Sequence, residues 1–168
     1  MKIKTILLPL AISLITPCTY AKNKAVQPAN NIEYPIGLSN WRVIGTSIRN
    51  DNNTQRVILG NTIAIRAARS NMAKTNWPQG AILAKFVWKN ESLATWPAAT
   101  VPGKFVHAEI MVRDTKKYAA TGGWGFARWK GEDLQPHGTD SRAADACFSC
   151  HQAAKETDFV FTRPAKLP

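Results

Sequence analysis

The stretch Ala81-Ile-Leu-Ala-Lys-Phe-Val-Trp88 carries the strongest β-strand signal in the chain. Alternate side chains of a strand point to opposite faces of its sheet. One face would carry Ile82, Ala84, Phe86 and Trp88, and the other Leu83, Lys85 and Val87. Both faces are apolar except at Lys85, so the pattern predicts a strand packed on both sides with one lysine among apolar neighbours.

Further strand-like segments lie on both sides of this stretch. Before it, an alternating segment begins at Trp41 and ends in the polar turn 50–53, and a short run follows at 56–59. After it, a Pro- and Ala-rich segment, 95–104, predicts a linker to a strand at 105–113. That strand would place His107, Glu109 and Met111 on one face. Residues 124–129 are again strand-like.

Two helices complete the predicted fold. Asn61 or Thr62 can cap a helix from Ile63 to Lys74, and Asp140 or Ser141 can cap a last helix through Ala153. About five short strands and two helices predict an α+β domain, mainly antiparallel sheet with a few helices, over residues 40–168. Residues 22–39 have no sustained period and predict an extended N-terminal segment.

The first 21 residues have the layout of a signal peptide. Lys2 and Lys4 precede an apolar run from Ile6 to Ile15, and small residues end at Ala21. The run is too short to span a bilayer, so the mature chain is expected to begin at Lys22, in the periplasm and without a membrane span. A lipidated Cys18 is the alternative, which the preceding proline disfavours.

Positive charge dominates the surface. The chain has 22 Lys and Arg against 11 Asp and Glu, and removing the signal peptide lowers the net charge from +11 to +9. The basic residues are scattered, and an exported protein rarely meets nucleic acid, so no nucleic-acid partner is expected. An acidic soluble redox partner or an anionic membrane surface fits this charge better.

The segment Cys147-Phe-Ser-Cys150-His151 predicts covalent attachment of one haem c. On the last predicted helix, its two thiols and imidazole lie at positions i, i+3 and i+4 of one face. Two thiols one turn apart can each add to a vinyl group of the haem, and the adjacent imidazole then points at the iron from the same side. Export agrees with this assignment, because c-type haem is attached outside the cytoplasm.

Three alternatives use the same residues. A zinc site needs further ligands, and neither His107 nor His137 has ligand-pair spacing to another candidate. A thioredoxin-like dithiol would follow the first strand of a βαβ unit, which the chain lacks. A structural disulfide between Cys147 and Cys150 remains open, but it would not require His151.

The ligand opposite His151 would decide the class of cytochrome. Met72 or Met111 in that position would make the protein an electron carrier. Both fall on apolar positions of predicted elements, where methionine commonly fills the core. An open position would instead allow iron to bind a small molecule.

The C-terminal half resembles the cytochrome P-460 family, whose other branch is the β-sheet type of cytochrome c-prime. The haem motif is followed by Lys155-Glu-Thr-Asp-Phe-Val-Phe-Thr-Arg163, and the similarity continues upstream through 123–126, 112–118 and 80–85. It covers roughly Trp41 to Arg163. The resemblance implies a mostly antiparallel fold, a homodimer and five-coordinate iron with an open distal pocket.

The resemblance also gives Lys85 a role. In cytochrome P-460 an equivalent lysine is cross-linked to the haem, and those proteins oxidise hydroxylamine. A lysine buried among apolar neighbours is expected to lose its proton and become nucleophilic, which agrees with such a bond. The c-prime-like branch lacks the cross-link, has a more apolar distal cap and binds nitric oxide or carbon monoxide.

Two further residues align approximately with polar positions of the family's pocket. They are Glu109, which could accept protons from bound hydroxylamine, and Arg56 at the start of the run 56–59. A strand-face ion pair and a surface cation are the structural alternatives for these two residues. The predicted function is a periplasmic mono-haem c-type cytochrome that oxidises hydroxylamine, with a non-catalytic nitric oxide-binding protein as the alternative.

Overall fold

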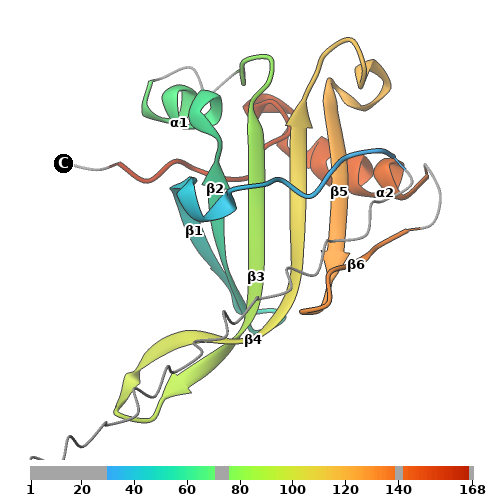
Figure 1. Ribbon diagram of the computed structural model, residues 1–168. Helices are drawn as coiled ribbons and strands as arrows, with labels where there is room; N and C mark the ends of the chain where they lie inside the picture. Colours follow the sequence, from blue (N-terminus) through green and yellow to red (C-terminus); the bar gives the residue numbers. More distant parts are fainter. Residues whose placement is uncertain (1–29, 71–75, 139–141, 167–168) are drawn as a thin grey trace, which may run out of the picture.

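Six antiparallel strands lie side by side in chain order in the part of the chain that the computed structural model describes, residues 30–70, 76–138 and 142–166 (Figure 1). The strands are β1 (Arg42–Arg49), β2 (Thr54–Gly60), β3 (Ile82–Leu93), β4 (Trp96–Arg113), β5 (Trp124–Lys130) and β6 (Gln135–Pro136). The α-helices are α1 (Thr62–Arg69) and α2 (Arg142–His151), and short 3-10 helices cover Leu38–Asn40, Ala119–Thr121 and Gln152–Thr157. The predicted α+β class, with a C-terminal helix that carries the two cysteines, is confirmed.

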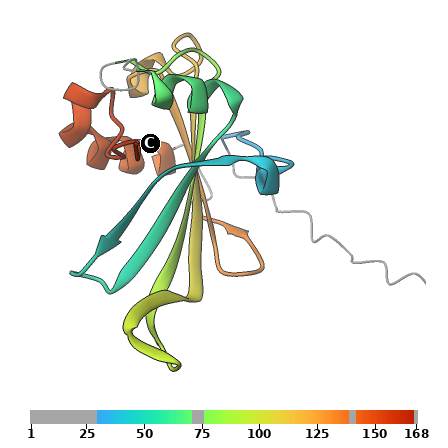
Figure 2. The ribbon, with the colours of Figure 1, turned by 90° about the vertical axis from the view of Figure 1, so that its left-hand side faces the viewer.

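The sheet separates two layers (Figure 2). Helix α2 and the C-terminal segment cover one side, which we call the α2 face, and residues 30–41 cover the other, which we call the N-terminal face. The strand pairing sets which side chains share a face, because directly paired residues point the same way. The α2 face carries Leu83, Lys85, Glu109, Met111, Phe126 and Arg128.

The α2 face has an aromatic core beside its charged residues. Trp77 and Trp124 are almost fully buried, and their ring centroids lie 6.4 Å apart. Helix α1 packs Ala64 and Ile65 into the same cluster. Asn61 caps this helix, because its side chain accepts a hydrogen bond from the Ala64 backbone N–H at 2.9 Å. This core supports the C-terminal segment that follows α2.

The N-terminal face is closed by the segment that the sequence predicted only as extended. Ile32 is 4 % exposed, and the Tyr34 ring meets the buried Trp129 ring edge-on at 5.2 Å. These residues pack on Ala84 and Ile110 of the two central strands. Residues 30–41 therefore serve as a covering layer for this side of the sheet.

The predicted linker 95–104 is wrong, because these residues form the first half of β4. They pair with the far end of β3, with Asn90 opposite Pro102 and Leu93 opposite Trp96, in a hairpin arm that extends beyond the sheet (Figures 1 and 2). Strand β5 pairs with β4 only between His107 and Arg113, so the arm has an unpaired edge. Proline is tolerated at such an edge because one row of backbone groups has no partner strand.

Both predicted helices end earlier than expected. Helix α1 stops at Arg69 because Ser70 is extended, with φ −86° and ψ 164°, whereas the prediction continued to Lys74. Residues 71–75 lie outside the described residues. Helix α2 ends at His151, and the chain continues as a 3-10 helix rather than as α-helix to Ala153. The predicted caps Asp140 and Ser141 also lie outside the described residues, as does the predicted signal peptide 1–21.

Replacing Ile32 with alanine tests the covering role of residues 30–41. The change leaves a cavity against the N-terminal face, and we expect the free energy of unfolding to fall by about 2–4 kcal/mol. Ile36→Ala is the matched control, because Ile36 is 92 % exposed and its loss should change stability by less than about 0.5 kcal/mol. Urea denaturation measures both. Equal, small effects would contradict the covering role.

Candidate functional site

Helix α2 presents the two cysteines of the haem motif as free thiols. Cys147 is half-buried and packs against the core of the α2 face, whereas Cys150, three residues later, is exposed. Burial raises the pKa of the Cys147 thiol. Because residues three apart on a helix lie one turn apart, both thiols are available on neighbouring positions of one side of α2.

The His151 ring is fixed in one tautomer by the chain that follows it. Its Nδ1 lies 2.6 Å from the backbone carbonyl oxygen of Phe159. A carbonyl oxygen can only accept, so Nδ1 carries the proton and donates it, and Nε2 is left with a lone pair. Burial lowers the pKa of His151, which also favours the neutral ring. Among the described residues, none bonds Nε2.

Aromatic side chains hold this ring on both sides. The centroid of Phe126 from β5 lies 5.1 Å from that of the His151 ring, and the centroid of Phe161 lies 5.2 Å away in an edge-on arrangement. Side chains of this size restrict rotation of the imidazole. The neutral ring is therefore a preorganised nitrogen ligand.

A row of charged side chains crosses the α2 face on three adjacent strands. The strand register places Lys85 of β3 opposite Glu109 of β4, and Glu109 opposite Arg128 of β5. Glu109 forms ion pairs with both neighbours, and its side chain is only 16 % exposed. The sequence predicted Lys85 among apolar neighbours alone; the structure corrects this, because a carboxylate faces it across the strand pair.

The two cations keep Glu109 ionised. Burial alone would raise the pKa of this carboxyl group, but the ion pairs with Lys85 and Arg128 outweigh burial and lower it to about 2. A histidine lies next to this carboxylate, with His107 Nε2 3.5 Å from Glu109 Oε1. Burial lowers the pKa of His107 to about 4, and the surrounding cations add to this effect. At neutral pH the row therefore holds a carboxylate and an uncharged imidazole.

Arg56 lies at the edge of this charged row. It sits on β2 opposite Val87, so its side chain shares the α2 face. It donates a hydrogen bond to Thr54 Oγ1, while its buried Nε has no partner among the described residues. Burial lowers the pKa of the Arg56 guanidinium, and the field of Glu109 opposes that change. Arg56 therefore lies on the same face of the sheet as Glu109, two strands away.

These groups suit a haem held between α2 and the sheet. Lys85, Glu109 and Arg128 act electrostatically on both Cys147 and His151, so the charged row and the helix face a common region. The buried Nε of Arg128, like that of Arg56, has no partner within the described residues. Two thiols, a neutral imidazole and unsatisfied cationic donors are the chemical partners that a porphyrin with carboxylate side chains requires.

The structure divides the large aromatic residues of β3 and β5 between the two faces of the sheet. Phe126 lies on the α2 face beside His151. Phe86, Trp88 and Trp129 point to the N-terminal face, so they fill or border the opposite layer. Of the two candidate methionines, Met111 packs on the α2 face, and Met72 falls outside the described residues.

Sequence analysis underestimated two features of the site. The ion pair of Arg128 with Glu109 could have been found by pairing the strands 105–113 and 124–129 as a hairpin, because that register sets the two residues opposite each other. The Phe159 carbonyl could not have been found, because every residue has a carbonyl and only the turn geometry selects this one.

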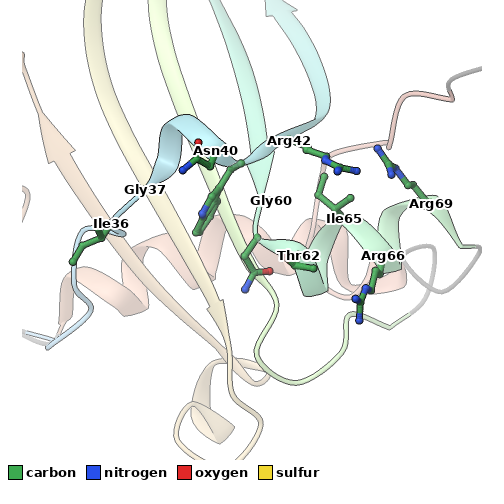
Figure 3. Close-up of a pocket in the computed structure, with 11 residues that line it drawn as sticks. Ile36, Gly37, Asn40, Arg42, Gly60, Thr62, Ile65, Arg66 and Arg69 are labelled. Carbon is green, nitrogen blue, oxygen red and sulfur yellow. The ribbon is translucent and has the colours of Figure 1, made fainter.

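A separate pocket of about 640 Å³ lies among α1, the start of β1 and the end of β2 (Figure 3). Ile36, Trp41 and Ile65 give it an apolar part, and Arg42, Arg66 and Arg69 give it a basic one. None of the cysteine, histidine, lysine or glutamate residues of the candidate site lines it. It is therefore a basic surface feature distinct from the haem-binding region.

The two cysteines and the histidine of α2 are consistent with a haem-binding protein of the cytochrome class. A family model, Cytochrome P460, matches residues 35–162, which is most of the chain. The chain belongs to the cytochrome P460 family, as the C-terminal motifs predicted. None of the individually curated proteins matches it.

In residues 30–70, 76–138 and 142–166, no three His, Cys, Asp or Glu side chains gather in a way that could hold a metal ion by themselves. No helix of this part of the chain is long and apolar enough to cross a membrane.

Acid titration of stability tests the charge states of this row. The folded pKa of Glu109 lies below its ordinary value of 4.5, so its stabilising contribution is complete above pH 4.5 and is lost as the pH falls towards 2. The folded pKa of His107 lies below 6.5, so the unfolded chain gains the proton first and stability is lost between pH 6.5 and 4. Glu109 contributes at most roughly 3 kcal/mol.

Urea denaturation at a series of pH values measures these losses. We expect Glu109→Gln to remove the loss of stability that Glu109 itself causes towards pH 2. Because Glu109 raises the pKa of His107, the same change should extend the His107 loss to lower pH. His107→Gln should remove the loss between pH 6.5 and 4 and keep most of the Glu109 loss. A Glu109→Gln curve that runs parallel to the wild-type curve below pH 4.5 would contradict the proposed charge state.

Proposed function

We propose that this chain is a periplasmic mono-haem c-type cytochrome that oxidises hydroxylamine. Thioether bonds would form at Cys147 and Cys150, with His151 as the axial ligand. One observation carries the proposal: the neutral His151 imidazole lies next to both free thiols on α2. Its Nδ1 carries the proton, and no described residue forms a hydrogen bond with its Nε2. Bound haem would supply iron that takes electrons from the substrate.

Lys85 is proposed to lie at the haem edge and to be cross-linked to it. Its strand places it on the α2 face, and its field acts on both Cys147 and His151. Glu109 is the direct partner of the Lys85 amino group and holds it on the α2 face. Forming the bond would replace one N–H of the lysine and one C–H of the haem, and an external oxidant such as a peroxide would take the two electrons released.

A tryptic digest of the purified protein tests this bond. We expect the peptide that contains Lys85 to remain joined to the peptide that contains Cys147 and Cys150. Lys85→Arg is the control, because arginine keeps the charge and cannot form the bond, so the two peptides should separate. Release of an unmodified Lys85 peptide from the wild-type protein would show that the cross-link is absent and would favour a gas-binding protein.

Glu109 is the proposed proton acceptor for the substrate. Hydroxylamine releases protons as it loses electrons, and a general base in the pocket must take them. Glu109 is ionised at neutral pH, and loss of the Lys85 charge in the proposed cross-link would raise its pKa and make it a stronger base. Arg56 would assist by adding positive potential near the bound substrate. The electrons would leave to an external acceptor cytochrome.

Replacing Glu109 with glutamine separates proton transfer from ligand binding. We expect turnover of hydroxylamine with an artificial electron acceptor to fall by about 10²–10⁴-fold, the usual contribution of a general base. Binding of nitric oxide, which needs no base, should change little. Glu91→Gln, on the exposed arm, is the matched control and should keep full activity. Unchanged turnover in Glu109→Gln would contradict the assignment.

A non-catalytic protein that binds nitric oxide or carbon monoxide is the second candidate. The observation in its favour is the apolar surface beside Lys85, where Ile58, Leu83 and Val87 are buried on the same face. An electron carrier is a third candidate, because Met111 packs on the α2 face. A methionine–iron charge-transfer band in the ferric spectrum would distinguish this third case.

The proposed location and partners follow from charge and family membership. Residues 1–21 have the signal-peptide pattern, and the mature chain would carry a net charge of +9. The arginines Arg42, Arg66 and Arg69 around the separate pocket offer a basic surface to an acidic redox partner (Figure 3). We further propose that the protein acts as a homodimer, as the family resemblance implies.

A further inference from the structure

The turn that follows α2 has an unusual backbone. Asp158 and Phe159 are consecutive residues with left-handed φ angles of 53° and 63°. Aspartate tolerates this region, but a bulky side chain such as phenylalanine rarely adopts it. Such conformations persist only where the surrounding structure holds them.

Asp158 is the point where the sheet holds this turn. Its side chain is 9 % exposed; Oδ2 accepts a hydrogen bond from the Trp77 backbone N–H at 2.8 Å, and Oδ1 lies 3.3 Å from Arg113 Nη2. Its backbone carbonyl accepts a further hydrogen bond, from Trp124 Nε1, at 2.9 Å. Three contacts from separate parts of the chain therefore fix both the side chain and the backbone of one residue.

The partners of Asp158 are themselves fixed. Arg113 is the last residue of β4, and its Nη1 donates a hydrogen bond to the Gly122 carbonyl at 2.7 Å. Its guanidinium carbon lies 5.3 Å from the centroid of the buried Trp124 ring. The turn is thus tied to the rigid centre of the α2 face rather than to a mobile loop.

Phe159 connects the anchored turn to the haem motif on α2. Its carbonyl oxygen accepts the hydrogen bond from His151 Nδ1, and its ring packs on Phe148 of α2 at a centroid distance of 5.2 Å. The ring also fills the space above Gly122, where a Cβ atom would lie 2.5 Å from it. A shift of the turn would therefore move the carbonyl that orients the imidazole.

We infer that Asp158 is a positioning residue for the axial histidine: its anchored carboxylate holds the left-handed turn that aims the Phe159 carbonyl at His151 Nδ1. This inference rests on the haem assignment of the proposed function. A strong hydrogen bond at Nδ1 raises the basicity of the ligating nitrogen, which strengthens its bond to iron and favours the ferric state. Asp158 would thereby set the redox potential without touching the haem.

Three substitutions at Asp158 distinguish the effect of its carboxylate contacts from the effect of its left-handed backbone conformation. Asn keeps an oxygen for the Trp77 N–H and tolerates left-handed φ, but it loses the charge pair with Arg113. Gly adopts the turn freely and has no acceptor, and Ala lacks both properties. In the haem-loaded protein we expect the ferrous iron–histidine stretching frequency, measured by resonance Raman spectroscopy, to fall in the order wild type, Asn, then Gly and Ala. The midpoint potential should rise in the same order.

Ile110→Val is the control for general loss of stability, because Ile110 is buried on the opposite face of the sheet. It should leave the stretching frequency and the potential at wild-type values. A Gly variant with the wild-type frequency would overturn the inference, because the carboxylate would then be dispensable. If the Gly and Ala variants fail to incorporate haem, the Asn variant decides, and a wild-type frequency in it would also overturn the inference.

Failure of the haem assignment itself would give a different result. The wild-type protein would then show no iron–histidine band, and the same full-length chain would still report on the turn. Nitrogen NMR of the His151 ring should show a proton on Nδ1 in the wild type and a mixture of tautomers in Asp158→Gly. Identical Nδ1 protonation in both would overturn the positioning role.

Discussion

The hydrogen bond from His151 Nδ1 to the Phe159 carbonyl oxygen is the constraint on which the site depends. It selects the tautomer in which Nε2 can ligate a metal, and it requires the chain to reverse direction immediately after the 3-10 helix. The reversal in turn requires a firm attachment to the sheet, which the contacts of Asp158 with Arg113 and Trp124 supply. The aromatic core of the α2 face thus supports the function as well as the fold.

The second organising feature is the balance of charge across three strands. A single carboxylate buried beside a cofactor would ordinarily gain a proton, since burial penalises its charge. The antiparallel register prevents this by placing Lys85 and Arg128 on the two sides of Glu109. If a covalent bond consumed the charge of Lys85, Arg128 would still compensate Glu109, so the site would retain one anion paired with one cation.

The sequence predicted the two central strands and the faces of their side chains, because a period of two residues is a direct property of strand geometry. Only the register of the strands shows that Lys85 and Glu109 share a face, the one that α2 covers. Sequence analysis missed the arm at 96–104, since its proline and alanine content is typical of a linker and only the pairing with β3 makes it a strand. It missed the Phe159 carbonyl because a backbone group leaves no mark in residue type.

A crystal structure of the mature, exported protein tests the central claim most directly. The account predicts a haem joined to Cys147 and Cys150, with His151 Nε2 bound to iron and His151 Nδ1 still donating to the Phe159 carbonyl. A colourless protein with unmodified thiols, or a haem whose iron is bound by another residue while His151 is turned away, would contradict it.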